Sequence, residues 1–442
     1  MDSKQIWEMV RSQAKIAPAI YGSVDFDSIP ERLVIEPGQP HDLGPGHDEL
    51  RERVLAMPGI ADLMRAYTFM GDRVADPYAA LMPEYGFKRL VDMLVQACDH
   101  GIDAVENAPA ELRALIEAME EIPDWIDMSL VEEGARYERA GTAIMSPLSM
   151  RATFIATFVN RYSALPMALT GALSSDGAAR RVRETSTFFS TSVLPGALKR
   201  NGEGFKAAAM VRLMHSMVRF NAMRKGRWDV SVYGIPIPQV DQMIAGLMSA
   251  ANLAVAAVKA GRKEFTPAER ARVEFNRYRC HLLGLPEVLL KTSPEDITTL
   301  LVARQGTIRP GFDQETCWVL MEATLAAYLP RDKSFFSRVF NRVETGFTRV
   351  FFVQSFANGD LAKAAAMGVT VNWTDKVCFA LAAGVTAMRL GLYAFAEKLP
   401  GLAERADRRL VAMIRRQLDA WGEAHFTTDA STYKPASPSV RA

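Results

Sequence analysis

Apolar residues recur every three or four positions along almost the whole of this chain of 442 residues, and strictly alternating apolar and polar residues are almost absent. The first pattern indicates helices that bury one face, whereas the second would indicate strands. Residues 87–98, 110–119 and 240–260 show helical periodicity, and a capping box with proline opens a further helix at residues 266–269. We therefore predict an all-α fold, arranged as a single large helical domain.

The two ends of the chain differ in composition from its middle. Residues 22–50 are rich in Gly, Pro, Asp and His, which predicts an irregular surface arm. The last residues are small, polar and interrupted by Pro, which predicts a flexible tail. We expect an irregular N-terminal arm with a short helix over residues 1–50, a helical domain over 51–426 and a tail over 427–442.

Two helical segments raise the question of a membrane or an anionic partner. Residues 377–396 are the most apolar stretch and are long enough to cross a bilayer, but Gly384, Arg389 and Gly391 interrupt them. We expect a helix buried in the core. Residues 402–421 predict an amphipathic helix with an Arg-rich outer face. That face could bind anions, although a solvated helix surface shows the same pattern.

Charge balance and cysteine count exclude several classes of protein. The chain has 52 Lys and Arg against 51 Asp and Glu, so its net charge produces no positive electrostatic field that would attract nucleic acid. We therefore expect no nucleic-acid partner. Its 4 cysteines form no CxxC pair, which argues against a structural zinc site and fits a reducing compartment. The first residues show no signal sequence. We expect a cytoplasmic protein, with peripheral membrane contact where an apolar substrate requires it.

Standard catalytic motifs are missing from the sequence. It contains neither the glycine-rich nucleotide-binding motifs nor the GxSxG, HExxH or Glu-x-x-His patterns. His41 and His47 come nearest to a metal cluster, but they lie among Gly and Pro, which is typical of a loose loop. With 6 His beside 22 Met and 22 Phe, a cofactor ligand has few candidates and many apolar residues to surround it.

The most informative stretch contains two predicted helices, over residues 178–193 and 203–224. On the first, helical spacing places Arg181, Glu184 and Thr185 on one face. On the second, His215 lies on an otherwise apolar face, with Arg212 three positions before it and Arg219 four positions after it.

Periodicity alone favours a buried structural histidine and an ordinary ion pair between Arg181 and Glu184. The functional interpretation is a haem ligand, because neutral imidazole on a rigid apolar helix is what a proximal ligand requires. Arg212 and Arg219 would then pair with haem propionates.

The sequence VRLMHSMVR, followed by WDVSVYGIPIPQVDQ, resembles the catalytic domain of the rubber oxygenases, or latex clearing proteins, and of the related MpaB-type oxygenases. The resemblance is strongest over residues 178–250. The residues that carry it are His215 within MHxxVR, Trp228, Asp229, Gly234, Ile235, Pro236, Gln239 and, upstream, Arg181 and Thr185.

This resemblance implies a globin-like helical core around b-type haem, with His215 as the proximal ligand of the iron. It implies that Arg181 and Thr185 line the distal side. Glu184 stands where latex clearing proteins have a lysine that can occupy the distal iron position. A carboxylate cannot reproduce that ligation, but it can accept a hydrogen bond or act as a base. The family's distal glutamate has no counterpart here, because residues 149–172 contain no acidic residue.

The resulting hypothesis is a haem b-dependent oxygenase with Arg181, Glu184 and Thr185 as catalytic residues. It would use O2 to cleave the C=C bond of an apolar, unsaturated, isoprenoid- or lipid-like substrate. Rubber itself is a poor candidate, because an extracellular polymer demands secretion. Two alternatives stay open: a helical haem- or lipid-binding protein without turnover, and a structural protein whose His215 is buried and metal-free.

Overall fold

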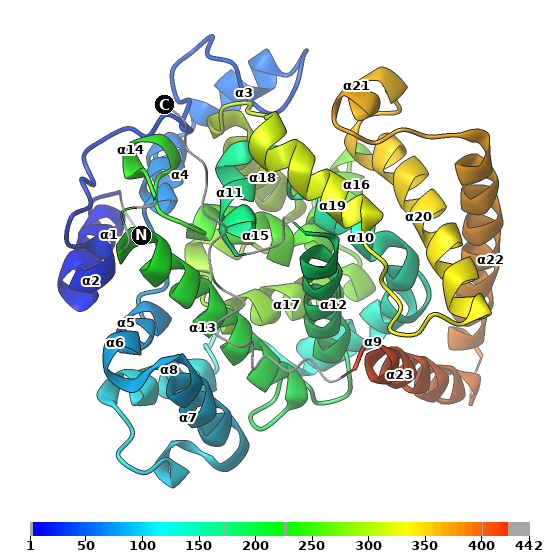
Figure 1. Ribbon diagram of the computed structural model, residues 1–442, viewed down its shortest axis with the longest axis horizontal. Coiled ribbons are helices and arrows are strands. Elements are labelled where there is room, and N and C mark those ends of the chain that lie inside the picture. The colour runs from blue at the N-terminus through cyan, green and yellow to red at the C-terminus, as the bar shows by residue number, and fades with distance from the viewer. Residues whose placement is uncertain (1–2, 171–173, 225, 227, 400, 423–442) are drawn as a thin grey trace. The chain divides into compact units, whose positions relative to one another are not determined.

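The computed structural model describes residues 3–170, 174–224, 226, 228–399 and 401–422; the predicted tail over 427–442 lies outside them. Every regular element in these ranges is a helix, so the predicted all-α class is confirmed (Figure 1). Contacts divide the chain into two compact units. Unit 1 comprises residues 1–134 and 198–310, and unit 2 comprises residues 135–197 and 311–442. The predicted domain boundaries near residues 50 and 426 stay predictions.

The helices of unit 1 come from both of its chain segments. They are α1 (Ser3–Ile16), α2 (Pro18–Tyr21), α3 (Asp48–Leu55), α4 (Ile60–Thr68), α5 (Ala75–Ala80), α6 (Met82–Tyr85), α7 (Phe87–His100), η1 (Ile102–Ala104), α8 (Ala110–Glu120), α13 (Glu203–Arg224), α14 (Val230–Tyr233), α15 (Gln239–Gly246), α16 (Met248–Lys259), α17 (Pro267–Leu282), η2 (Glu287–Leu289) and α18 (Pro294–Thr307). The boundary between the units falls within α9 (Met128–Ile144).

Side-chain caps mark the start of α14, α17 and α18. The predicted capping box is present at α17, where the Thr266 side chain accepts from the Glu269 backbone N–H and the Glu269 carboxylate accepts in return. The prediction of one helix over 240–260 is wrong, because α15 and α16 meet at a bend of 72°. Gly246 ends α15, and a Cβ at this position would lie 2.5 Å from the Cys280 sulfur on α17, so the packing leaves no room for a side chain at the bend.

The irregular stretch between α2 and α3 is held down by buried arginines. Arg51 is 2% exposed and donates from Nε to the Gly306 carbonyl at 2.7 Å and from Nη2 to the Val34 carbonyl at 3.0 Å. Arg32 donates to both carboxylate oxygens of Asp241 at 2.9 and 2.7 Å. Residues 22–47 contain no helix, as their composition predicts. The arginine contacts bury part of this segment.

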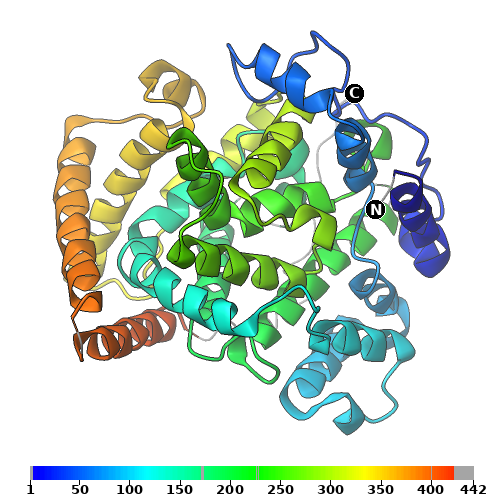
Figure 2. The same cartoon turned by 180° about the vertical axis from the view of Figure 1, so that it is seen from behind.

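Beyond α9, the other helices of the described residues belong to unit 2. They are α10 (Ser146–Ala156), α11 (Arg161–Leu169), α12 (Ser175–Ser192), η3 (Gln314–Trp318), α19 (Val319–Ala326), α20 (Phe335–Phe356), α21 (Leu361–Ala366), α22 (Trp373–Glu397) and α23 (Leu402–Trp421). Its core includes Phe158 and Phe352. It also encloses an ion pair at 2.8 Å between Arg151 and Glu344, whose side chains are 0% and 1% exposed. Helices α20 and α22 lie side by side in both views (Figures 1 and 2).

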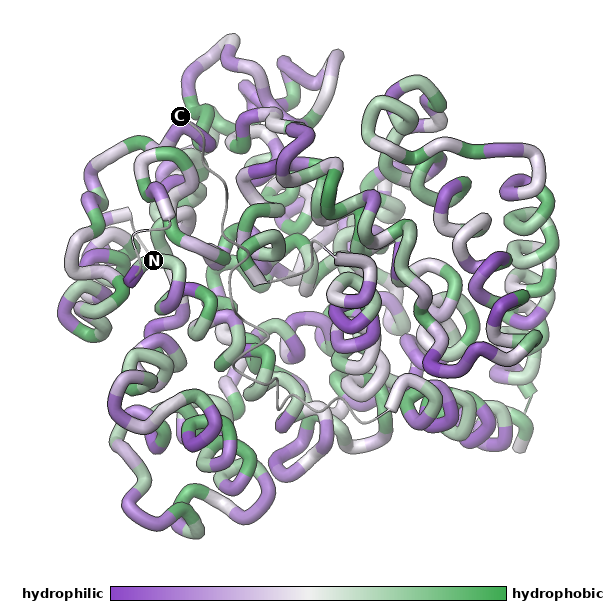
Figure 3. The backbone as a smooth tube through the Cα atoms, viewed as in Figure 1, coloured by the Kyte–Doolittle hydropathy of each residue, from purple (hydrophilic) through white to green (hydrophobic). Residues whose placement is uncertain are grey.

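Helix α22 contains the apolar stretch 377–396, and the prediction that it is a buried core helix is wrong. By length and composition it could cross a membrane, yet only 11% of its most apolar 18 residues are buried. Figure 3 shows the hydrophobic colouring along this exposed helix. One side of α22 packs on α20, and the other side faces outward.

Candidate functional site

Helix α13 carries His215 near its middle, and the imidazole contacts a side chain of α15, which also belongs to unit 1. His215 Nδ1 lies 2.9 Å from Oε1 of Gln242, which is on α15. Gln242 is 9% exposed, and its neighbour in this network, Gln239, is 1% exposed. The contact is therefore largely shielded from water.

A chain of two glutamine amides fixes which nitrogen of His215 carries the proton. Gln239 Nε2 donates to the backbone carbonyls of Gly71 at 3.0 Å and Gly284 at 3.1 Å, and carbonyls only accept. Gln239 Oε1 then accepts from Gln242 Nε2 at 3.2 Å. Gln242 consequently turns its oxygen to His215, so Nδ1 must be the donor. In the neutral ring the lone pair is left on Nε2, the form of imidazole that binds a metal.

Buried carboxylates neutralise the two arginines that flank His215. Arg219 Nε lies 2.9 Å from Asp76 Oδ1, and both side chains are 0% exposed. Arg212 donates to Asp72, from Nη2 to Oδ1 at 3.0 Å. Burial opposes ionisation of Asp72, but the charge and hydrogen bonds of Arg212 hold its pKa below the ordinary value. These pairs fix the position of α13; contact of either arginine with a cofactor stays a prediction.

Glycines allow these groups to approach the backbone closely. At Gly284 the backbone has a φ of +85°, and a Cβ would lie 2.6 Å from Asp72 Oδ2 and 2.8 Å from Arg212 Nε. At Gly71 a Cβ would overlap the Tyr21 hydroxyl. Both glycines that accept hydrogen bonds from Gln239 therefore also make room for the charged pairs.

Helix α12, in unit 2, carries the three predicted catalytic residues. Arg181 Nη1 donates to Glu184 Oε2 at 2.9 Å, and Nη2 donates to the Thr170 carbonyl at 3.4 Å. The two charged side chains are 14% and 18% exposed, and Thr185 is half-buried. The structure thus brings Arg181 and Glu184 together, as their spacing predicts. Helix α12 belongs to unit 2, whereas α13 with His215 belongs to unit 1.

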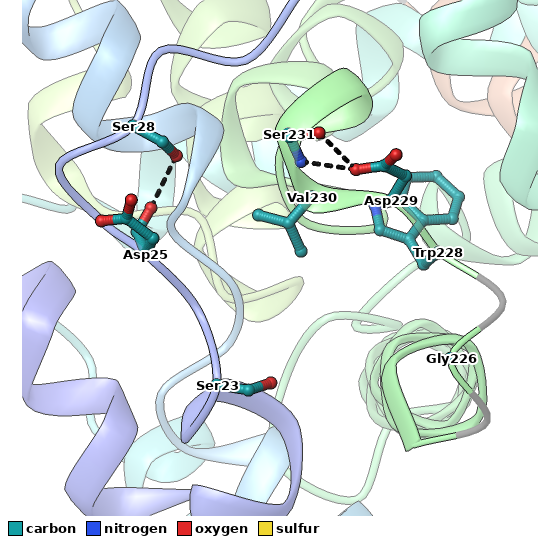
Figure 4. Close-up of a pocket in the computed structure, with 8 residues that line it drawn as sticks. All are labelled: Ser23, Asp25, Ser28, Gly226, Trp228, Asp229, Val230 and Ser231. Carbon is teal, nitrogen blue, oxygen red and sulfur yellow. Dashed lines mark hydrogen bonds between the residues drawn. The ribbon is translucent and has the colours of Figure 1, made fainter.

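The tryptophan–aspartate part of the sequence motif shapes a turn. Asp229 caps α14, because its Oδ1 accepts from the Ser231 backbone N–H at 2.9 Å and from the Ser231 hydroxyl at 2.6 Å (Figure 4). Trp228 Nε1 donates to the Gly234 carbonyl at 2.6 Å. A shallow pocket of about 510 Å³ opens beside this turn, lined partly by Ser23, Asp25, Ser28 and Asp229. Its lining does not include His215, and the pocket is open to solvent.

His281 and His41 lie in structural surroundings. His281 stacks on Tyr278 and meets Trp125 edge to face. Burial, with a contribution from the charge of Arg212, lowers the pKa of His281 to about 4. His41 lies 3.1 Å from an Asp48 carboxylate oxygen. Within the described ranges, no three His, Cys, Asp or Glu side chains gather as metal ligands, and all 4 cysteines are free thiols.

Sequence reasoning missed Gln242, Asp72 and Asp76. A usable signal for Gln242 was its spacing of three from Gln239, which predicts a shared helix face. Asp72 lies just before α5 and Asp76 lies in its first turn, and neither has a local signal that connects it to its partner on α13, 140 and 143 positions away.

Comparison with known proteins gives two matches. The family described as "ER-bound oxygenase mpaB/B'/Rubber oxygenase, catalytic domain" matches residues 139–389. The solved structure of latex clearing protein in the closed state is similar with a TM-score of 0.56 and 17% identity, covering 79% of this chain and 91% of that chain. At this identity the structural likeness shows a shared fold. Among curated proteins, no sequence matches the chain.

Proposed function

Because the chain belongs to the MpaB and rubber oxygenase catalytic-domain family, and is an oxygenase of that type, we propose that it depends on haem b and acts on an apolar, unsaturated substrate. The observation that carries the haem proposal is the amide chain that ends on His215 Nδ1. It leaves Nε2 as the ligand atom, and a hydrogen bond from Nδ1–H to an amide oxygen raises the basicity of that atom.

His215 is the residue that would hold the haem iron, and Gln242 would keep its ring in one orientation. Haem b, when bound, supplies the iron centre at which O2 is activated. Arg212 and Arg219 hold α13 in position through their side-chain ion pairs with Asp72 and Asp76. We assign them a positioning role in addition to the propionate contact expected from the sequence.

The residues of α12 are proposed to serve the reaction through hydrogen bonds and proton transfer. Arg181 and the Thr185 hydroxyl are hydrogen-bond donors that would stabilise negative charge arising in the reaction. Glu184 Oε2 holds Arg181 at 2.9 Å and offers a proton acceptor where the family has a lysine. Phe188, which is 4% exposed, and Phe189 supply apolar surface on the same helix.

For the substrate we propose an isoprenoid- or lipid-like molecule whose C=C bond is cleaved to carbonyl products. The support is the family's name and the name of the structural neighbour, together with the apolar composition of the chain. A cytoplasmic location is part of this proposal and is tested by cell fractionation. The alternative, a haem- or lipid-binding protein without turnover, is favoured by the replacement of the lysine with Glu184.

The haem proposal is tested by the visible spectrum of the purified protein. We expect a Soret band and a pyridine haemochromogen of b type, lost in His215→Ala and kept in His100→Ala, whose histidine is exposed on α7. A colourless protein that does not bind added hemin would exclude both the oxygenase and the haem-binding proposals.

Turnover is tested separately by O2 uptake and carbonyl products, with polyprenyl and unsaturated lipids compared with their saturated analogues. Glu184→Gln and Thr185→Val are expected to lower uptake, by about 10²-fold if they act on a proton or on oxygen. Glu322→Gln, an exposed glutamate on α19, is the matched control. A haem-loaded protein without uptake on any unsaturated lipid would support the binding protein instead.

A further inference from the structure

Helix α22 carries a row of large apolar side chains on its outer face, which we define as its exposed positions between residues 377 and 395. The row consists of Val377, Leu381, Val385, Met388, Leu392 and Phe395, spaced at three and four positions along one side of the helix. Leu381 is 67%, Met388 60% and Phe395 63% exposed. Every exposed position in this range is Gly, Ala or a larger apolar residue. A contiguous exposed face of this kind marks an interaction surface.

Basic residues lie at both ends of the outer face and on the helix that follows it. Exposed Lys376 and Lys398 lie at the two ends of α22, with exposed Glu397 beside Lys398. The helix that follows, α23, exposes an excess of basic residues over Glu404 and Asp419, as the sequence predicts. These basic residues are Arg405, Arg408, Arg409, Arg415 and Arg416.

A groove in unit 2 connects the apolar face with these charges. It has a volume of about 620 Å³, and its lining includes Leu381 and Val385 of the outer face together with Arg389 and Arg416. Arg389 Nη2 also lies 3.5 Å from the Met413 sulfur on α23. Apolar side chains and guanidinium groups therefore share one surface, which is the composition of an amphipathic element at an anionic lipid boundary.

We propose that the outer face of α22, with the cations beside it, docks unit 2 on an anionic lipid bilayer, with the helix lying along the surface. The opposite side of α22 excludes a spanning orientation, because it is packed on α20 and joined to it by an ion pair at 2.8 Å between Arg342 and Asp375. Insertion across the bilayer would carry Arg338, Arg342 and Arg349 of α20 into hydrocarbon.

A second copy of the chain fits this surface less well. A two-fold interface uses the same surface on both partners, so it would place two positively charged surfaces against each other. An anionic bilayer offers both negative charge for the basic residues and an apolar phase for the row of apolar side chains. The docking does not depend on haem or on turnover, although a bilayer is also the phase in which an apolar substrate is concentrated.

The proposal is tested by flotation of the full chain with vesicles of phosphatidylcholine alone or mixed with phosphatidylglycerol. We expect binding to the anionic vesicles, weakened by about 0.5 M salt, and a blue shift of Trp373 emission, with Trp373→Phe as the reference. Leu381→Glu with Leu392→Glu should weaken binding about tenfold or more, because two exposed leucines no longer enter the apolar phase.

The matched control is Ile122→Glu with Val258→Glu, which places the same charge on exposed apolar positions of unit 1. Arg409→Gln with Arg416→Gln should weaken binding to anionic vesicles on the order of tenfold and leave binding to neutral vesicles unchanged. Far-UV circular dichroism checks that each variant folds. The proposal is overturned if the wild type floats with neither vesicle, if the outer-face variant binds as well as the control, or if light scattering finds a dimer that the outer-face variant dissociates.

Discussion

The ion pair between Asp76 and Arg219 gives a prediction that the structure determines closely. Asp76 accepts from Arg219 Nε at 2.9 Å, from the Asp72 backbone N–H at 2.9 Å and from the Tyr21 hydroxyl, with its own side chain 0% exposed. Asp76→Asn keeps the shape of the side chain and removes its negative charge. It also places an amide N–H donor opposite groups that themselves donate hydrogen bonds. Loss of one partner of a buried pair costs about 3–5 kcal/mol, because the other charge is left uncompensated.

The measurement is urea unfolding followed by far-UV circular dichroism, with the free energy of unfolding taken from the midpoint and slope. We expect Asp76→Asn to lose about 3–5 kcal/mol. Asp92→Asn, an exposed aspartate on α7, should stay within about 0.5 kcal/mol of the wild type. The double change Asp76→Leu with Arg219→Met should be far less harmful than Asp76→Asn, since it removes both charges.

Two results would refute this reasoning. One is a loss below about 1 kcal/mol for Asp76→Asn, because the carboxylate would then not be compensating a buried charge. The other is a double variant as unstable as the sum of its two single changes, which would show that the charges act independently.

Four other predictions follow from the same structure. Glu344→Gln should destabilise unit 2 by about 3–5 kcal/mol in urea, because it leaves Arg151 buried without its counter-charge, and Glu344→Leu with Arg151→Met should recover most of the loss. Burial lowers the pKa of His281 in the folded state to about 4, whereas in the unfolded state the pKa is near its ordinary value of about 6.5. The unfolded state therefore binds a proton first, and about 3 kcal/mol of stability should be lost as pH falls from about 6.5 to about 4. His281→Phe should flatten this part of the plot of unfolding free energy against pH. Burial raises the pKa of Cys98, Cys280 and Cys317 to about 12, so at pH 8 a thiol reagent should label Cys378 first, and a rapid release of two or more thiols would contradict this. Gln242→Leu should weaken hemin binding about 10–100-fold, with Gln242→Glu retaining it; equal affinity in all three proteins would mean that the amide chain does not support the ligand.

Helix positions could be predicted from the sequence because periodicity and caps are local. The predicted helix over 402–421 is α23, and the predicted helix over 203–224 is α13. The bend between α15 and α16 has no local signal in the sequence; Gly246 at the bend packs against Cys280, a residue on another helix. The exposure of α22 was mispredicted for a related reason: an apolar helix has the same composition whether protein or lipid covers it.

The candidate site was predictable only in part. The motif around His215 identified the ligand candidate, and helical spacing predicted the contact between Arg181 and Glu184. The hydrogen-bond partner Gln242 and the counter-charges Asp72 and Asp76 come from distant parts of the chain, so only the folded structure brings them to α13.

The long sequence separations within unit 1 set an order of events during synthesis. The Asp72–Arg212 and Asp76–Arg219 pairs join residues 140 and 143 positions apart, and unit 1 closes only when residues 198–310 meet residues 1–134. Contacts of such high order form late and slowly. Gly284 must also be in place before Gln239 and Gln242 can orient His215. The haem binding that we propose at His215 would therefore follow the synthesis of residues 198–310, which complete unit 1.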